Sequence, residues 1–247
     1  MADADDELGA DRAAAGGAEK AKFVRDAFSR IAPKYDLLNH LLSFNVDKGW
    51  RRKAIAELGV DRGRGARYLD LCAGTLDLSA AISATDGFQG TVTAVDFAEP
   101  MLVAGRPKIA GRRVNLVAGD ALRLPLATGS MSGAIVAFGI RNVSALDAAL
   151  AEVNRILVPG GRFVILEFSI PRSPLINTGY QLYFRNILPA VGGWVSGHRA
   201  AYRYLPRSVA NFPVMEELAR RMRDAGFRDV RWRSLSLAIA AIHVGLR

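Results

Sequence analysis

The sequence predicts an α/β protein built on a mostly parallel, doubly wound sheet of seven strands with helices on both faces. Short apolar runs rich in β-branched residues recur between residues 66 and 169, helical stretches separate most of them, and two further apolar runs close the chain. Buried parallel strands have this near-continuous apolar character. Strands that alternate with helices are joined by right-handed crossovers, which gives one sheet with two covered faces.

Four of the seven expected strands end in a polar or small residue. The expected strands are ARYLDLC (66–72), GTVTAVD (90–96), RRVNLVAGD (112–120), SGAIVAF (132–138), GRFVILEFS (161–169), FRDVRWRSL (227–235) and LAIAAIHVGL (237–246). The expected helices are TLDLSAAIS (75–83), AEPMLVAGRPKIA (98–110), SALDAALAEVNRIL (144–157), closed by PGG, and one at about 213–225. Ligands of such sheets lie beyond the carboxyl ends of the strands, so the residues that follow each strand are the site candidates.

We expect one domain at residues 21–247, preceded by a disordered tail. Residues 1–20 are acidic and rich in Ala and Gly, and they lack the basic start and apolar core of a secretion signal. Residues 21–60 have helical spacing with a break at Pro33, which predicts short N-terminal helices. A polar and aromatic segment at residues 170–212 interrupts the alternation and predicts an inserted, lid-like element on the substrate side.

Composition excludes several classes of protein. No run reaches the roughly 20 apolar residues that a bilayer-spanning helix needs. The single cysteine, Cys72, excludes an internal disulfide and a cysteine zinc site, and the three histidines lack metal-ligand spacing, so we expect a cytoplasmic protein without a metal. The formal charge of +9, from 33 Lys and Arg against 24 Asp and Glu, favours an anionic partner such as nucleic acid or anionic lipid, or else a solvated face.

The turn after the first strand is built from small residues. Asp70 lies near the end of the strand, and Cys72, Ala73, Gly74 and Thr75 follow it. Small residues let a ligand approach the backbone, and the next helix offers unpaired N–H groups. A single glycine disfavours the pyrophosphate of a dinucleotide, which needs the fuller G-x-G-x-x-G pattern. A ligand without phosphate fits better, and S-adenosylmethionine is such a ligand.

Acidic residues end the next two strands. Asp96 ends the second strand, where an acid is the expected partner of ribose hydroxyls, and Asp120 ends the third, where its carboxylate could accept a hydrogen bond from an adenine amino group. Each has a simpler alternative: Gly74 permits a tight turn, Asp96 caps the following helix, and Asp120 begins a turn. Their occurrence at successive strand ends favours a nucleoside-binding site.

Several segments together resemble the class I S-adenosylmethionine-dependent methyltransferases, and among them the ubiquinone/menaquinone biosynthesis C-methyltransferase family. YDLLNHLLSFNVDKGW (35–50) is similar to the family's first signature, and RILVPGGRFVILEFS (155–169) is similar to its second. FGIRNV (138–143), YRYLPRSVANFP (202–213) and AGF (225–227) also look like family segments. The resemblance implies a Rossmann-like methyltransferase fold and S-adenosylmethionine as the cofactor.

The cofactor loop departs from the family pattern. The family's loop typically reads Gly-Thr-Gly-Asp, whereas here it is Gly74, Thr75, Leu76 and Asp77. If the Leu76 side chain points into the packing face of the following helix, cofactor binding survives; if it points at the methionine moiety, affinity falls. The positions that match the family's cofactor contacts are Thr75, Asp96, Asp120 and Ala121.

The resemblance implies C-methylation of a reduced polyprenyl quinone ring. Arg141 and Asn142, directly after the fourth strand, match a family motif beside the acceptor. We expect Arg141 to stabilise the developing oxyanion and Asn142 to orient it, because an arginine pKa above about 12 makes a poor base. The alternative is a helix-capping Asn beside a surface Arg. The LDLCAGT variant of the loop favours demethylmenaquinol as the acceptor over the benzoquinol of ubiquinone synthesis.

The acceptor side is assigned to three further residues by the resemblance, namely Tyr35, Asp36 and Tyr202. The proton acceptor stays open between Asp36, His198, Tyr202 and a water. The aromatic side chains of the insertion either wall a pocket for a flat ring and prenyl tail or belong to the core. A prenylated substrate would enter from the membrane, so we expect a positive face in peripheral contact with anionic lipid, at the inner face of the membrane.

Two rival functions fit parts of the sequence. The first is an RNA or other small-molecule methyltransferase on the same fold. Positive charge suits RNA, but no separate RNA-binding module is visible, so we expect no nucleic acid partner. The second is a non-catalytic scaffold of quinone biosynthesis, suggested by Leu76 and by Gly133, where the family often has Asp. A homodimer is compatible with the sequence.

Overall fold

The sheet has seven strands, and all but one of them run in the same direction. The computed structural model describes residues 18–32, 35–36, 43, 45–61, 63–183, 186 and 199–247. The strand order is β3-β2-β1-β4-β5-β7-β6, with β7 antiparallel to both of its neighbours. The strands are β1 (Arg67–Leu71), β2 (Thr91–Asp96), β3 (Val114–Ala118), β4 (Met131–Ala137), β5 (Leu157–Phe168), β6 (Arg228–Leu235) and β7 (Ala240–Leu246). The predicted mostly parallel sheet is confirmed.

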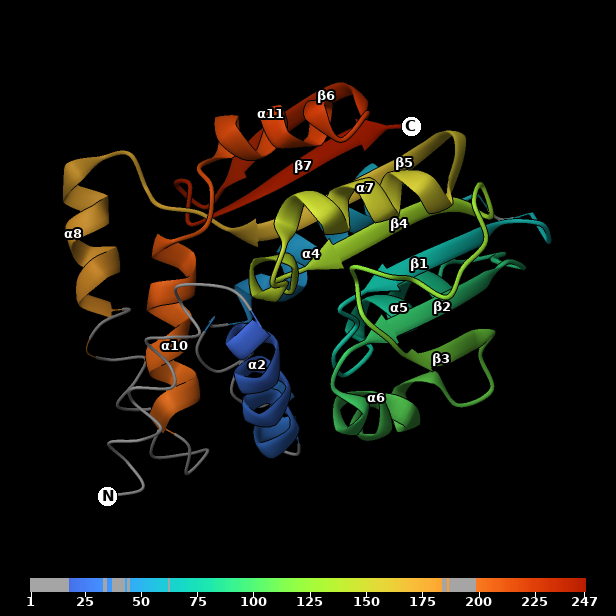
Figure 1. Cartoon of the computed structure of the whole chain (residues 1–247), viewed down its shortest axis with the longest axis horizontal. Coiled ribbons are helices and arrows are strands. Elements are labelled where there is room, and N and C mark those ends of the chain that lie inside the picture. Colours follow the sequence, from blue (N-terminus) through green and yellow to red (C-terminus); the bar gives the residue numbers. More distant parts are fainter. Residues whose placement is uncertain are drawn as a thin grey trace.

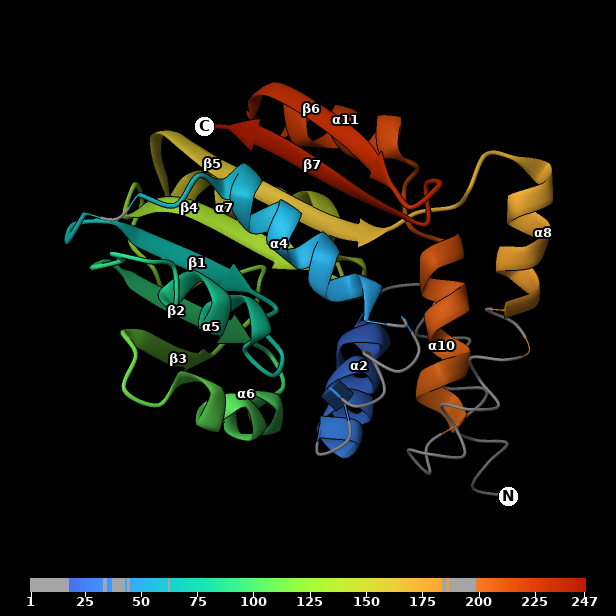
Figure 2. The same cartoon turned by 180° about the vertical axis from the view of Figure 1, so that it is seen from behind.

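Helices cover both faces of this sheet. Figure 1 shows α7 and α11 in front of it, and Figure 2 shows α4 and α5 over the opposite face. Beyond the carboxyl ends of the strands stand α2, α10 and α8. The described helices are α2 (Ala18–Ile31), α4 (Val46–Leu58), α5 (Asp77–Ser83), α6 (Glu99–Gly105), α7 (Leu146–Ile156), α8 (Pro174–Leu182), α10 (Arg199–Ala210) and α11 (Met215–Asp224), with 3₁₀ turns η2 (Arg106–Ile109) and η3 (Ile140–Asn142).

Alternation along the strands divides the core into two layers. Leu69 and Phe163 belong to the layer under α7 and α11, whereas Tyr68 and Val164 belong to the layer under α4 and α5. Successive side chains of a strand point to opposite faces, so each apolar strand supplies both layers. Because both faces of such strands are covered, ligands of this kind of sheet bind beyond the carboxyl ends of the strands.

Several element boundaries differ from the sequence prediction, and three of them have a structural reason. The predicted helix 75–83 begins only at Asp77, because Leu76 has the left-handed backbone φ of 69°. The predicted helix 98–110 changes to the 3₁₀ turn η2 at Arg106, where Pro107 can donate no hydrogen bond to a preceding turn. The PGG expected to close α7 lies inside β5, where the backbone of Gly160 and Gly161 pairs with Arg247.

The two segments predicted outside the α/β core are only partly described. Helix α2 begins at Ala18, so the last three residues of the predicted tail are helical, and residues 1–17 lie outside the described residues. The 170–212 insertion contributes α8 and α10, while 184–185 and 187–198, which include the candidate His198, lie outside the described residues. No helix in the described part of the chain is long and apolar enough to span a membrane.

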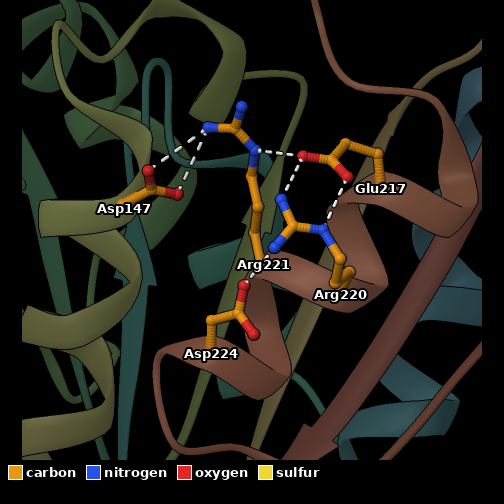
Figure 3. Close-up of polar contacts among 5 residues, drawn as sticks. All are labelled: Asp147, Glu217, Arg220, Arg221 and Asp224. Atoms are coloured by element: carbon orange, nitrogen blue, oxygen red, sulfur yellow. Dashed lines mark hydrogen bonds and ion pairs between the residues drawn. The ribbon is translucent and has the colours of Figure 1, made fainter.

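An exposed charge network joins two helices on one face of the sheet (Figure 3). Arg221 of α11 contacts Asp147 of α7 at 3.3 Å and Glu217 at 3.0 Å. Arg220 pairs with Glu217 at 2.7 Å and with Asp224 at 2.5 Å. Exposed ion pairs contribute little to stability. These arginines therefore form a solvated face, which accounts for part of the positive charge of the chain.

A buried histidine makes the folded state sensitive to acid. His243 of β7 is 2% exposed, and its Nε2 donates to the Met215 carbonyl oxygen at 2.9 Å. Burial lowers the pKa of His243 from 6.5 to about 4. Since the unfolded chain binds this proton first, the contribution of His243 to stability is full above pH 6.5 and is lost as the pH falls toward 4.

We therefore expect the unfolding free energy to drop by up to about 3 kcal/mol over this range relative to a His243→Gln variant. Urea denaturation of both proteins from pH 6.5 to 4 measures the difference. The buried Asp70, whose pKa burial raises to about 7, has the opposite pH dependence but is present in both proteins, so it cancels. Parallel pH curves for the two proteins would refute a neutral buried His243.

Candidate active site

A pocket opens at the carboxyl ends of β1, β2, β3 and β4. The empty space in it, with the open mouth counted, is about 770 Å³. The strand ends form its floor, and α2 forms a wall. Its lining includes Gly74, Asp96, Asp120, Ala121, Asn142 and Tyr35, all predicted from the sequence.

The loop after β1 reaches the pocket through residues with left-handed backbone. Cys72 has φ 52° and Gly74 has φ 53°, and both line the pocket. At Gly74 an added Cβ would lie 3.6 Å from Met101 and 3.9 Å from Tyr35, in ordinary van der Waals contact. Glycine adopts this conformation without the steric cost of a side chain, so the loop can bring its backbone to a ligand.

Leu76 points away from the pocket. Its side chain is fully buried and packs with Ala94 and Leu102 under α6. Helix α6 approaches this loop closely at Gly105. A Cβ atom added there would lie 2.5 Å from the Thr75 carbonyl oxygen and 2.7 Å from Leu76. Of the two orientations considered for Leu76, the structure has the one that leaves the cofactor side of the loop clear.

Asp96 joins two of the strand-end loops. One carboxylate oxygen accepts the Gly74 N–H at 2.8 Å, and the other accepts the Ala98 N–H at 2.8 Å. Burial raises the pKa of Asp96, while these N–H groups oppose that shift. The bond to Ala98 is the helix-side contact expected of a cap, but the side chain also lines the pocket. Each carboxylate oxygen has a second lone pair, so Asp96 can still accept hydrogen bonds from ligand hydroxyls.

Asp120 and Ala121 lie at the end of the next strand. The Asp120 Oδ1 accepts the Leu122 N–H at 2.9 Å, which is the turn-forming contact of the simpler alternative. Both residues nevertheless line the pocket beside Gly119. Turn formation and ligand contact are therefore compatible at Asp120, as they are at Asp96.

Asp70, Thr75 and Asp36 are not among the residues that line the pocket. Asp70 is 1% exposed, and its Oδ2 accepts the Ser79 N–H at 2.9 Å and the Ser79 hydroxyl at 2.6 Å. It holds the first turn of α5 from below. The Thr75 hydroxyl donates to Asp36, and Asp36 pairs with Lys108 at 2.5 Å. These contacts hold the loop in position.

Arg141 is buried in an ion pair. Its guanidinium contacts Glu167 Oε1 of β5 at 2.8 Å, donates to the Phe138 carbonyl oxygen, and lies over the Phe168 ring at 5.4 Å. Arg141 and Glu167 are 7% and 2% exposed, so the alternative of a surface Arg is wrong. The adjacent Asn142 lines the pocket, and its Oδ1 has no hydrogen-bond partner among the described residues.

Comparison with known proteins decides the family of this chain. Residues 16–247 match the model of the ubiE/COQ5 methyltransferase family. The chain belongs to this family. A similar relative, demethylmenaquinone methyltransferase of Thermus thermophilus, is 45% identical over 89% of this chain and 99% of the relative. Ubiquinone/menaquinone biosynthesis C-methyltransferase UbiE of Geobacter sulfurreducens is 42% identical over 92% and 89%.

A solved structure shares the fold at low sequence identity. A SAM-dependent methyltransferase from Thermotoga maritima has a TM-score of 0.60 at 19% identity, covering 90% of this chain and 98% of that chain. The predicted Rossmann-like methyltransferase fold is confirmed by this likeness and the strand order. Family membership confirms the predicted enzyme class, an S-adenosylmethionine-dependent C-methyltransferase of the menaquinone and ubiquinone pathways.

Some residues of this ubiE/COQ5 family site carried no functional signal in the sequence. The α2 wall consists of Ala21, Val24, Arg25 and Phe28, whose spacing predicts only a helix. The Arg25 guanidinium lies 5.6 Å from the centre of the Phe97 ring, which follows β2. This cation–π contact closes α2 against the sheet edge.

The loop after β4 packs closely against the loop after β1. Phe138 lines the pocket with φ 58°, and an added Cβ on Gly139 would lie 2.4 Å from the Cys72 Cβ. Only glycine lets these two strand-end loops approach so closely.

Tyr202 lies in α10, but its side chain is outside what the structure describes. Among described residues, no cluster of His, Cys, Asp and Glu could hold a metal ion.

Proposed function

We propose that the chain transfers the methyl group of S-adenosylmethionine to a ring carbon of a reduced polyprenyl quinone precursor. Demethylmenaquinol is the favoured acceptor, in accord with the name of the Thermus relative, and the benzoquinol of ubiquinone synthesis is the second candidate, in accord with the name of the Geobacter relative. The observation that carries the proposal is a pocket lined at four successive strand ends in a chain of this family.

The pocket suits the cofactor's adenosine. Asp96 has free lone pairs for the two ribose hydroxyls, and Asp120 would accept from the adenine amino group. Gly74 gives access to the loop backbone, and Ala121 leaves space at the third strand end. When bound, the cofactor supplies a methyl group already activated on a sulfonium. The single glycine in the loop after β1 is consistent with a ligand that carries no phosphate.

The chain's own residues would position the acceptor rather than activate the methyl group. Asn142 would orient a ring hydroxyl, and the charge of Arg141, fixed by Glu167, would stabilise the developing oxyanion. Phe138 packs against Phe168 with tilted rings whose centres are 4.6 Å apart, and it would exclude water from one side. Well-oriented reactants can account for roughly 7–11 kcal/mol of the barrier.

We further propose that the protein makes peripheral contact with the inner face of an anionic membrane. Large apolar side chains are exposed on α8, with Leu175 at 85% and Leu182 at 60%. Figure 1 places α8 at the side of the molecule where α2 and α10 stand, beyond the strand ends. Two exposed leucines on a helix beyond the strand ends support entry of a prenylated substrate from lipid. The homodimer stays a prediction.

An assay of acceptors and binding tests the proposed function. The purified protein, S-adenosylmethionine and chemically reduced demethylmenaquinol should give a product heavier by one methylene in the mass spectrometer. The reduced benzoquinol precursor should be methylated more slowly. Calorimetry should detect binding of S-adenosylhomocysteine to the pocket. A scaffold without a cofactor site would give no heat of binding. Tight, salt-sensitive retention of RNA on a filter, without quinol methylation, would favour the RNA methyltransferase.

A further inference from the structure

Lys108 joins two carboxylates that come from distant parts of the chain. It lies in η2, directly after α6. Its Nζ lies 2.5 Å from Oδ2 of Asp36 in the N-terminal segment and 2.6 Å from Oδ1 of Asp77, the first residue of α5. The three side chains are between 24% and 35% exposed, so salt screens their charges less than those of fully exposed pairs. One ammonium group therefore holds two acids together.

Asp36 is also tied to the loop after β1. Its Oδ1 accepts a hydrogen bond from the hydroxyl of Thr75, which is 4% exposed. Neither Asp36 nor Thr75 lines the pocket, but their sequence neighbours Tyr35 and Gly74 both do. The contacts of Asp36 therefore join the two chain segments from which Tyr35 and Gly74 reach the pocket.

The Tyr35 ring lies against the loop after β1. A Cβ atom added to Gly74 would lie 3.9 Å from Tyr35 Cε1 and 3.6 Å from Met101 Cε. Tyr35 packs edge-on against Phe28 of α2, with ring centres 5.8 Å apart, and against the buried Met101 of α6. Figures 1 and 2 both place α2 next to α6 at the strand ends. Apolar packing is non-directional, whereas the ion pair and hydrogen bond of Asp36 fix one position for the backbone beside Tyr35.

Asp77 extends the network to a second aromatic residue of the pocket. Its Oδ2 lies 3.7 Å from Nη2 of Arg51 in α4, and Arg51 Nε lies 3.4 Å from Asp47 Oδ2. The Arg51 guanidinium lies 5.2 Å from the centre of the Phe138 ring, which lines the pocket. Acidic and basic side chains therefore alternate along one network, which consists of Asp36, Lys108, Asp77, Arg51 and Asp47.

We propose that Lys108 is a positioning residue for the cofactor: by holding Asp36 against the loop after β1, it fixes the Tyr35 ring in the wall of the cofactor pocket. This inference rests on the proposed function. Lys108 does not line the pocket, so it acts through Tyr35 and not by touching the ligand. Without the Lys108 charge, Asp36 and Asp77 are neighbouring like charges that repel each other. Asp36 then leaves the loop, and Tyr35 leaves the pocket wall with it.

Calorimetric titration with S-adenosylhomocysteine tests this role. Lys108→Met keeps the apolar stem and removes the charge. We expect it to weaken binding about 3- to 30-fold, the range for residues that act on a site without touching its ligand. Arg231→Met is the matched control, because it also removes the cation of an ion pair, with Glu57 at 2.8 Å, and neither of these residues lines the pocket. Its dissociation constant should equal that of the wild type.

A double variant shows whether Lys108 acts through Tyr35. Tyr35→Ala removes the ring and should itself weaken binding, and the addition of Lys108→Met should then weaken it no further. A lysine that only supports the fold would give additive losses. Additive losses, or a Lys108→Met protein that binds within about twofold of the wild type, would overturn the proposal.

Two further observations keep the test decisive. Asp36→Asn releases the same ion pair from its other side, so it should weaken binding as Lys108→Met does and should also lose its effect beside Tyr35→Ala. If Lys108→Met fails to fold, which its melting curve would show, Asp36→Asn and its double variant decide the question. A wild-type protein that does not bind S-adenosylhomocysteine would instead contradict the proposed function.

Discussion

Replacement of Asp96 by Ala should weaken binding of S-adenosylhomocysteine by at least about 100-fold. Hydrogen bonds to a charged group contribute roughly 1.5–3 kcal/mol each, and this carboxylate would accept from two ribose hydroxyls. The variant also releases the N–H groups of Gly74 and Ala98, which Asp96 holds at 2.8 Å, so the loop after β1 loses its fixed position. Calorimetric titration of the variant and the wild type measures the difference.

The matched control for this experiment is Asp61→Ala. Asp61 also accepts a backbone N–H, that of Gly63 at 2.9 Å, but it lies before β1 and therefore at the opposite end of the strand. Its loss should leave the dissociation constant unchanged. A dissociation constant for Asp96→Ala within about threefold of the wild type would show that the nucleoside binds elsewhere.

Removal of Glu167 should produce the largest loss of stability. Burial raises the pKa of Glu167, and the Arg141 charge opposes that shift, so each charge depends on the other. Glu167→Ala leaves the Arg141 guanidinium buried without its carboxylate, a change that typically costs about 3–5 kcal/mol. For a chain of this size the melting midpoint should fall by roughly 10 °C. Differential scanning calorimetry measures the shift.

Two further variants isolate the buried pair. Asp224→Asn removes one carboxylate from the exposed network on α11, where Arg220 pairs with Asp224, and should leave the melting midpoint nearly unchanged because exposed pairs contribute little. The double variant Arg141→Met/Glu167→Leu replaces the pair by apolar groups and should recover most of the lost stability while remaining inactive. If the melting midpoint of Glu167→Ala equals that of the wild type, the charges of Arg141 and Glu167 are not buried together.

Strand ends were predictable from the sequence, because their signals are local. Asp96 and Asp120 directly end apolar runs, and parallel strands bring their carboxyl ends to one edge of the sheet. Asp70 could have been separated from them by alternation: it precedes the last residue of β1 and shares the face of Tyr68, so it meets α5 and not the pocket.

Contacts between distant segments were not predictable in this way. The Arg141–Glu167 pair spans 26 residues, and the Lys20–Arg141 contact spans 121. Such pairings depend on how β5 and α2 are placed in space, which no local spacing records. Leu76 is a third case, because a leucine with positive φ is rare and its buried position under α6 depends on the close approach at Gly105.

Transfer of an isotopically labelled methyl group would show which atom of the acceptor the protein methylates. The protein would be given S-adenosylmethionine with a deuterated methyl group and chemically reduced demethylmenaquinol without oxygen, and the product would be located by fragmentation in the mass spectrometer. We expect the intact deuterated methyl group on a ring carbon, with none of it on a hydroxyl oxygen. A folded protein that binds S-adenosylhomocysteine but labels neither the naphthoquinol nor the benzoquinol ring would contradict it.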